Sequence, residues 1–333
     1  MNEEPNKEQV NSLFNKLLSE KPEEKDPLQK NLLKELQTIS SRKTFAYLAN
    51  FKTYPHNMIN FDDKSFVSAL MDSIPKTTEA IDFILHSPGG FAESTEMIVK
   101  LLRSRYKHIR FIIPHSAKSA ATMLALSGNE ILMTPSAELG PIDPQVSGAI
   151  SGPAQSIIDG FNDIKKIVDK EKKLNGAYVP LLNKMDVATI KQCETALNYG
   201  INLVRDWIAK YMFEEEKAKP AIKKLKARFI AKFFSDHRRH LTHGRPIIYG
   251  EAAKVGVRVK NVEEVNLDYA EKLKEYYMRF EGIFSMNSRI NKIFQSENEY
   301  MVNLTPVVQL IGPLPFPHLP ISPPVPPQNP QQK

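Results

Sequence analysis

Short apolar runs alternate with amphipathic stretches through the middle of the chain. Four runs have the composition and length of buried strands; they cover 44–49, 81–85, 109–113 and 131–133. Between two of these runs, Met97, Ile98, Leu101 and Leu102 lie on one face of a helix expected over 93–102. Strand, helix and strand in this order predict a parallel crossover, so we expect an α/β domain.

Helical spacing continues on both sides of this region. Apolar residues fall on one face over 10–18 and again over 28–39, where Asp26 and Pro27 are typical of a cap and a first helical residue. Three further helices are expected over 157–173, 187–210 and 268–283. The last of them carries an aromatic stripe that indicates either subunit packing or core.

Composition restricts the class of protein. The chain has 333 residues, of which 41% are hydrophobic and 25% charged, so a disordered chain is excluded. Cys193 is the single cysteine and cannot form an internal disulfide, which indicates a reducing compartment. No run of about 18 apolar residues could span a membrane, and the first residues lack the basic and apolar pattern of a signal peptide. We therefore expect a cytoplasmic protein.

Two charged features suggest a nucleic-acid or metal partner, but the residues around each feature disfavour it. The net charge is +7, and a basic run over 217–245 could contact phosphates, but it lacks an aromatic stacking platform, so nucleic acid is not expected. His237, His240 and His243 are spaced by threes like metal ligands. Two arginines separate the first two histidines and oppose a divalent cation, so we expect no metal site.

The first candidate for chemistry is the turn Ser-Pro-Gly-Gly at 87–90. Gly89 and Gly90 follow a predicted strand, and without side chains their N–H groups can be approached closely by a substrate carbonyl. The same turn is also an ordinary tight connection. His86, directly before it, either lines a cleft or fills the end of the strand.

The second candidate is Ser119, in a run of small residues at the start of a predicted helix. A hydroxyl there lies near unpaired helix N–H groups, which favour a developing negative charge. Serine is also among the commonest helix caps, so this motif alone does not establish a nucleophile. His115, four residues earlier, is interpreted as a loop residue.

Several blocks in this order resemble the serine peptidases of the ClpP/crotonase superfold. They most closely resemble the signal peptide peptidase A-like branch, whose soluble members are called serine dehydrogenase proteinases. The matching blocks are 84–90, 98–104, 117–123, 138–145, 243–246 and 249–257. The resemblance implies a fold of repeated β-β-α units, with the match running from about residue 43 to residue 259.

Carried onto this chain, the resemblance makes Ser119 the nucleophile of an acyl-enzyme mechanism. The oxyanion hole would be the N–H of Ala120 with that of Gly90 or Gly89. These peptidases need no metal and no organic cofactor, and they assemble into homo-oligomers. We expect 268–283 or the N-terminal helices at the subunit interface.

The general base is left open by the sequence. The segment 138–145 corresponds to the histidine region of ClpP but holds no histidine, which favours a Ser-Lys dyad. A lysine acts as a base when apolar surroundings lower its pKa, and Lys184 has apolar neighbours in the sequence. The alternatives are no lysine base at all or a lysine of the charged helix: Lys165, Lys166 or Lys170. Asp143 either orients a partner or stabilises its own turn.

The chain is accordingly divided into four parts. They are an amphipathic helical arm over 1–42, a ClpP/crotonase-like peptidase domain over 43–259, a helical extension over 260–302 and a proline-rich tail over 303–333. Ten of the 24 prolines fall in the tail, which is too rich in proline to fold alone. It is either a disordered spacer or a docking segment for a partner that binds proline motifs.

The leading hypothesis is a serine peptidase acting on peptides or loosely structured proteins. The sequence leaves two alternative functions open. One is a peptidase-like scaffold that binds peptides without turnover, because the base is uncertain. The other is a crotonase-type enzyme acting on coenzyme A thioesters, which would use the same oxyanion geometry.

Overall fold

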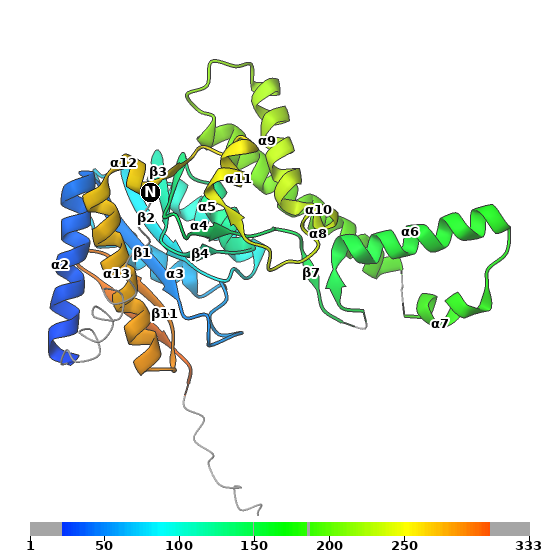
Figure 1. Ribbon diagram of the computed structural model, residues 1–333, viewed down its shortest axis with the longest axis horizontal. Helices are drawn as coiled ribbons and strands as arrows, with labels where there is room; N and C mark the ends of the chain where they lie inside the picture. The colour runs from blue at the N-terminus through cyan, green and yellow to red at the C-terminus, as the bar shows by residue number, and fades with distance from the viewer. Residues whose placement is uncertain (1–21, 149, 185–186, 307–333) are drawn as a thin grey trace, which may run out of the picture.

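The computed structural model describes residues 22–306, except 149, 185 and 186 (Figure 1). The helix expected over 10–18 and nearly all of the proline-rich tail lie outside the described residues. Among the helices within that part of the chain, none combines the length and the apolar character needed to cross a membrane.

A mixed seven-stranded sheet forms the centre of the molecule. In sheet order its strands are β10 (Val259–Asn261), β5 (Glu130–Met133), β3 (His108–Ile113), β2 (Ala80–His86), β1 (Lys43–Ala49), β11 (Ile290–Gln295) and β12 (Tyr300–Leu304). The first five run parallel, and β11 and β12 add two antiparallel strands at one edge. The expected α/β class with a mainly parallel sheet is confirmed.

Side chains alternate between the two faces of this sheet, as the period of two in a strand requires. Phe45 and Tyr47 of β1 join one apolar cluster, whereas Ala46 and Leu48 join another. The larger cluster is covered mainly by α3 (Asp63–Asp72), α4 (Ala92–Arg103), α5 (Ala120–Leu126), α8 (Val187–Trp207), α9 (Pro220–Ser235) and α11 (Tyr249–Lys254).

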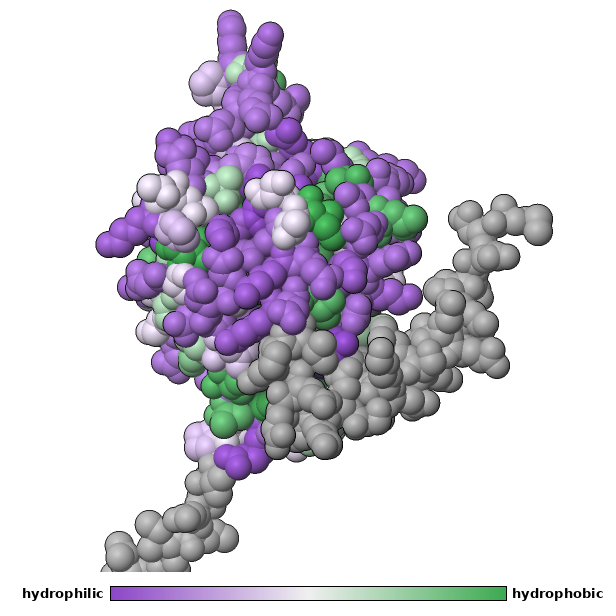
Figure 2. Space-filling model, turned by 90° about the vertical axis from the view of Figure 1, so that its left-hand side faces the viewer, coloured by the Kyte–Doolittle hydropathy of each residue, from purple (hydrophilic) through white to green (hydrophobic). Residues whose placement is uncertain are grey.

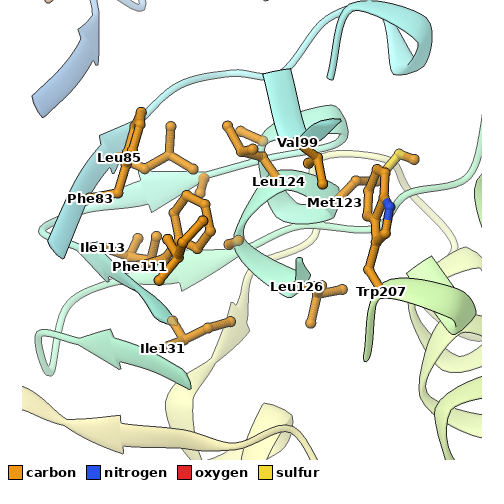
Figure 3. Packing of buried hydrophobic residues seen from close by; sticks show 14 of the residues in the cluster. Phe83, Leu85, Val99, Phe111, Ile113, Met123, Leu124, Leu126, Ile131 and Trp207 are labelled. Atoms are coloured by element: carbon orange, nitrogen blue, oxygen red, sulfur yellow. The ribbon is translucent and has the colours of Figure 1, made fainter. Parts of the chain in front are cut away.

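Helix α5 lies within this larger cluster. Figure 3 shows Phe111 of β3 packed toward Leu124, with Met123 beside Trp207 of α8. All seven residues of α5 are buried. The residue that precedes this helix is therefore held by a rigid part of the core.

The opposite face of the sheet is covered by α2 (Pro22–Ser40) and α13 (Leu267–Met286) (Figure 1). The aromatic stripe of α13 packs inward within the chain, with Tyr276 and Phe280 at 0% exposure, so it is core. The outward surface on this side is mainly hydrophilic where described residues form it (Figure 2). Helix α2 already includes the residues from Pro22 on, so the helix does not begin at Pro27 as the sequence suggested.

The segment 260–302 differs from the helical extension expected there. It contains the short helix α12 (Val262–Val265) and α13, but also β11 and β12, which complete the sheet. Polar residues in β11 hide its strand pattern, since Asn291, Lys292 and Gln295 are buried at 0–1% exposure. Their partners are supplied by distant segments that sequence periodicity does not reveal.

A helical projection extends from this body (Figure 1). It is distinct from the arm expected over 1–42 and is called the arm from here on. It contains β7 (Gln145–Val146), β8 (Gly152–Pro153), α6 (Ala154–Glu171), a 3₁₀ turn (Gly176–Tyr178), α7 (Val179–Leu182) and the beginning of α8. A small apolar cluster joins α6 to α8, and it includes Cys193 at 0% exposure. Helix α8 then continues into a π-helical turn (Ile208–Met212) that joins the main core.

Candidate functional site

Ser119 lies in a sharp turn between strand β4 (Ser116–Ala117) and helix α5. Its backbone has φ 52° and ψ −123°, a left-handed region that residues other than glycine rarely adopt. Such strain costs about 1–3 kcal/mol and persists where the surroundings enforce it, often at active sites. The Ser119 Oγ makes no hydrogen bond within the described part of the chain, so the hydroxyl is available to a ligand.

The glycine turn packs directly against Ser119. Gly89 has φ 97°, and a Cβ placed on it would lie 2.5 Å from Lys118 O and 2.7 Å from Ser119 Cβ. Only glycine combines this conformation with this approach. The two motifs, about 30 residues apart in sequence, therefore form one structural unit.

Two N–H groups flank the Ser119 turn without a partner among the described residues: those of Gly90 and Ala120. The Gly89 N–H is already used, because it donates to Ser87 Oγ at 3.2 Å. Of the two glycines, Gly90 thus offers the free donor. Unpaired N–H donors beside a hydroxyl are what an oxyanion hole for acyl transfer requires.

A small sheet holds the Ser119 turn in place. Its strands are β4, β6 (Glu138–Leu139) and β9 (Ile247–Ile248), in that order. On its outer side, β4 is bound to Ser87, whose N–H donates to Ser116 O at 3.0 Å and whose carbonyl accepts from Lys118 N at 3.0 Å. Lys118 Nζ lies 2.8 Å from Glu138 Oε1, which ties β4 to β6.

His86 braces the strands that carry both motifs. It is 2% exposed, and its Nδ1 lies 3.2 Å from Ser116 N, which can donate to it. Phe51 stacks on the ring at 4.5 Å, and Tyr277 and His115 contact it edge-on. Burial, together with nearby His115, lowers the pKa of His86 to about 3. The imidazole is therefore neutral and serves as a brace at the end of β2.

We expect this histidine to make the fold sensitive to acid. Between pH 6.5 and about pH 3 the unfolded chain binds a proton at His86 that the folded chain does not, so stability falls as the pH falls through this window. The slope from this one group is at most about 1.4 kcal/mol per pH unit. H86Q should flatten the pH dependence of the unfolding free energy measured with urea.

The matched control for this experiment is H56Q, because His56 is exposed. It should keep the wild-type pH dependence. Equal slopes for wild type and H86Q would contradict the assignment of a buried neutral His86.

A carboxylate and two histidines meet beyond the small sheet. Asp143 is 1% exposed and lies 2.7 Å from His243 Nδ1 and 3.1 Å from His237 Nδ1, at the start of α10 (His237–His240). A carboxylate on Nδ1 fixes the tautomer and leaves Nε2 to handle a proton. The Nε2 of His243 has no hydrogen-bond partner in the described part of the chain.

The register of the small sheet directs the segments that lead to this cluster over the edge where Ser119 lies. Ala117 pairs with Leu139 in parallel, and Leu139 pairs with Ile247 in antiparallel fashion. Residues after Ala117, after Leu139 and before Ile247 therefore leave the sheet over the same edge. Contact continues beyond the paired positions, since a Cβ on Gly140 would lie 2.6 Å from Lys118 Cδ.

The four candidate lysines lie elsewhere. Lys184 is exposed and follows α7, which Figure 1 places on the arm, away from α5. Lys165, Lys166 and Lys170 are exposed on α6, and Lys166 pairs with Asp163 at 2.9 Å. Within the described residues, none of these amines forms a hydrogen bond with Ser119 Oγ.

The three histidines considered as metal ligands do not form one ligand set, because only His237 and His243 contact Asp143. His240 Nε2 bonds to Phe233 O at 2.7 Å, and its Nδ1 lies 3.0 Å from the guanidinium of Arg245. Across residues 22–306, leaving aside the three undescribed positions, no group of three or more His, Cys, Asp or Glu side chains is arranged to hold a metal ion.

The fold agrees with the comparison to known families. The model of the ClpP-like SDH-type serine proteinases matches residues 49–280. The chain belongs to this family.

Two uncharacterized proteins of Methanocaldococcus jannaschii are similar in sequence. One is 30% identical over 210 residues, which cover 63% of this chain and 63% of that protein. The other is 30% identical over 179 residues, covering 54% of this chain and 51% of that protein. The matched part thus spans less than two thirds of the length of either relative.

Two solved structures also resemble the chain. They are a serine-to-alanine mutant of the 1510-N membrane-bound stomatin-specific protease and a lysine-to-alanine mutant of it in complex with a substrate peptide. The first has a TM-score of 0.35 and 19% identity, and covers 64% of this chain and 79% of its own. The second has a TM-score of 0.34 and 19% identity, and covers 62% of this chain and 74% of its own.

Proposed function

We propose that this protein is a serine peptidase that cleaves peptides or loosely structured proteins through an acyl-enzyme on Ser119. The observation that carries the proposal is the strained Ser119, with a free hydroxyl, packed against the glycine turn, while the N–H groups of Gly90 and Ala120 are unpaired among the described residues. Membership of a serine proteinase family favours this function over an acyl-coenzyme A enzyme. The proposal includes no metal and no organic cofactor.

The reaction would follow the order of acyl transfer. Ser119 Oγ attacks the scissile carbonyl while a base takes its proton, and the oxyanion accepts hydrogen bonds from Gly90 and Ala120. The protonated base then gives its proton to the leaving amine, and water releases the acyl group. Preorganised N–H donors cost no rearrangement during the reaction, which is why the rigid setting of α5 supports catalysis.

For the base, the geometry supports His243 oriented by Asp143. The carboxylate is buried, its bond to Nδ1 is 2.7 Å long, and the small sheet directs the segments that lead to both residues over the edge where Ser119 lies. The Ser119–Lys184 dyad remains the alternative. Because Lys184 is exposed on the arm, that dyad requires the arm to fold back or to reach Ser119 of a second copy.

The arm also supports a homo-oligomer. Leu174, Val179, Leu181 and Val187 are 41%, 41%, 54% and 76% exposed on and around α7. Apolar side chains gathered on a projecting element are typical of a protein-binding surface. We propose that the arm contacts a neighbouring subunit, in place of the inward-facing stripe of α13.

The base assignment is tested by hydrolysis of an unfolded, fluorescein-labelled reporter protein. H243A and D143N should each lower kcat/KM by on the order of 10³–10⁴-fold, since both leave Ser119 without an oriented base. K184A should stay within about twofold of wild type. H237A, which removes the longer contact to Asp143, is the matched control and should lose less activity than H243A.

The reverse pattern, with K184A inactive and H243A active, would assign the base to the lysine. In that case a mixture of S119A and K184A chains, inactive separately, should regain activity if the arm acts on a second copy. Binding of the reporter without cleavage by the wild type would favour a scaffold over a peptidase.

A further inference from the structure

Lys292, in strand β11, is a charged side chain in the middle of the protein. Its side chain is 0% exposed, as is that of Asp63, and its Nζ lies 2.6 Å from Asp63 Oδ1. Burying two charges has a desolvation cost that often cancels their attraction, so an ion pair of this kind is weak evidence for a role in stability alone. Its other contacts indicate a different role.

The pair binds the backbone on both sides of Ile59. Lys292 Nζ donates to Met58 O at 3.0 Å. The second carboxylate oxygen of Asp63 accepts from Asn60 N at 3.0 Å and from Tyr47 OH at 2.8 Å. Two charge-assisted hydrogen bonds therefore fix the peptide groups that flank Ile59.

Ile59 in turn holds the glycine turn of the candidate site. Its N–H donates to Gly89 O at 2.7 Å, and its carbonyl accepts from Phe91 N at 2.9 Å. A Cβ on Gly90 would lie 2.3 Å from Ile59 O, so the two backbones are in direct contact. In this parallel bridge the Gly89 carbonyl and the Phe91 N–H both bond to Ile59. The N–H of Gly90, which lies between them, therefore faces away from Ile59.

We propose that Lys292 is a positioning residue of the oxyanion hole: with Asp63 it fixes Met58 and Asn60, and through Ile59 it aims the Gly90 N–H at the Ser119 site. The inference rests on the proposed function. It adds to the site a strand beyond residue 280, where the family match ends. The antiparallel strand β11 thereby acquires a part in positioning the candidate site.

An apolar pair at these positions would not replace the charges. Met58 O and Asn60 N, whose hydrogen bonds are part-buried, would then lose their present partners. A polar group that loses its partner where water does not reach it keeps its desolvation cost. The segment would shift to recover hydrogen bonds, and the glycine turn would shift with it. Displacements near 1 Å in an active site can lower rates by about 10²-fold.

The test removes both charges at once. K292M alone leaves an unpaired buried carboxylate and should be unstable. K292M/D63N removes both charges and should regain stability, while Met58 O stays without its lysine. We expect kcat for peptide hydrolysis to fall about 10- to 100-fold with KM within about twofold of wild type. The rate of Ser119 labelling by a fluorophosphonate should fall in parallel.

The matched control is R110M/D82N. It removes another ion pair with a fully buried carboxylate, Arg110 Nη2 to Asp82 Oδ2 at 2.6 Å, from the middle of the sheet. It also takes the carboxylate from Arg42, whose Nε lies 2.7 Å from Asp82 Oδ1. It should lose comparable stability and keep wild-type kcat. If K292M/D63N regains its stability and also has wild-type kcat, the positioning role is wrong.

Hydrogen exchange gives a readout that does not depend on peptidase activity. In K292M/D63N the amides of Ile59 and Phe91 should exchange faster than in wild type and in R110M/D82N. Wild-type protein that neither cleaves peptides nor reacts with the probe would overturn the proposed function. The exchange rates would still test whether Lys292 and Asp63 hold the segment around Ile59. Should the double variant not fold, D63N serves instead; wild-type kcat and exchange in folded D63N would overturn the inference.

Discussion

Replacing Ser119 with alanine is expected to lower kcat/KM for peptide hydrolysis by on the order of 10⁴-fold or more. Without the hydroxyl no acyl-enzyme forms, and only the oxyanion donors and substrate binding remain. The fold should be retained, because Ser119 Oγ makes no hydrogen bond within the described residues. The measurement is the initial rate on the fluorescein-labelled unfolded reporter, with the unfolding free energy measured in parallel.

The matched control is S136A, which removes an exposed hydroxyl from the loop that precedes β6. It should keep the wild-type rate and stability. Residual activity of S119A within tenfold of wild type would show either that another residue is the nucleophile or that a contaminating enzyme is responsible.

The second large effect is expected for G89A. Alanine at φ 97° is strained, and its Cβ would lie 2.5 Å from Lys118 O and 2.7 Å from Ser119 Cβ. The glycine turn and the Ser119 turn must therefore separate. We expect the unfolding free energy to fall by on the order of 2–5 kcal/mol and kcat to fall at least about 10²-fold, because the oxyanion donors lose their position.

G250A is the matched control for this substitution. Gly250 lies in α11, and a Cβ there would meet no atom within 4 Å. Activity should stay close to wild type. Stability should stay close to wild type or rise slightly, since alanine favours a helix. A G89A protein with wild-type kcat would show that the glycine turn does not belong to the catalytic site.

The strands of the parallel sheet could be predicted because each is a local pattern. Ile81, Phe83 and Leu85 face one apolar cluster and Ile84 faces the other, so β2 reads as a continuous apolar run in the sequence. Strand β11 could not be found in this way. Its central Lys292 is buried only because Asp63, more than two hundred residues earlier, neutralises it.

The same distinction holds for the candidate site. Ser119 and the two glycines could be singled out because a small-residue turn beside a helix start is visible in the sequence. The contact between Asp143 and His243 could not, since it depends on the pairing of β6 with β9, about 100 residues apart. A signal was present in part: Asp143 stands in an apolar, proline-bounded segment, where a buried carboxylate needs donors.

The setting of Lys184 depends on contacts that its sequence neighbours do not reveal. Its apolar neighbours in the sequence suggested a desolvated amine, but Val179 and Leu181 are 41% and 54% exposed in the described chain. Apolar residues near a lysine lower its pKa only when they exclude water from it. The dyad therefore stays a prediction that depends on what covers the arm.

The most direct test of whether Ser119 is the nucleophile is covalent labelling by a fluorophosphonate probe, followed by mass spectrometry of the peptides. We predict one label per chain, located on Ser119, absent from S119A and formed much more slowly in H243A. A folded wild-type protein that takes up no label, or an S119A protein labelled as fast as wild type, would contradict the claim that Ser119 is the nucleophile.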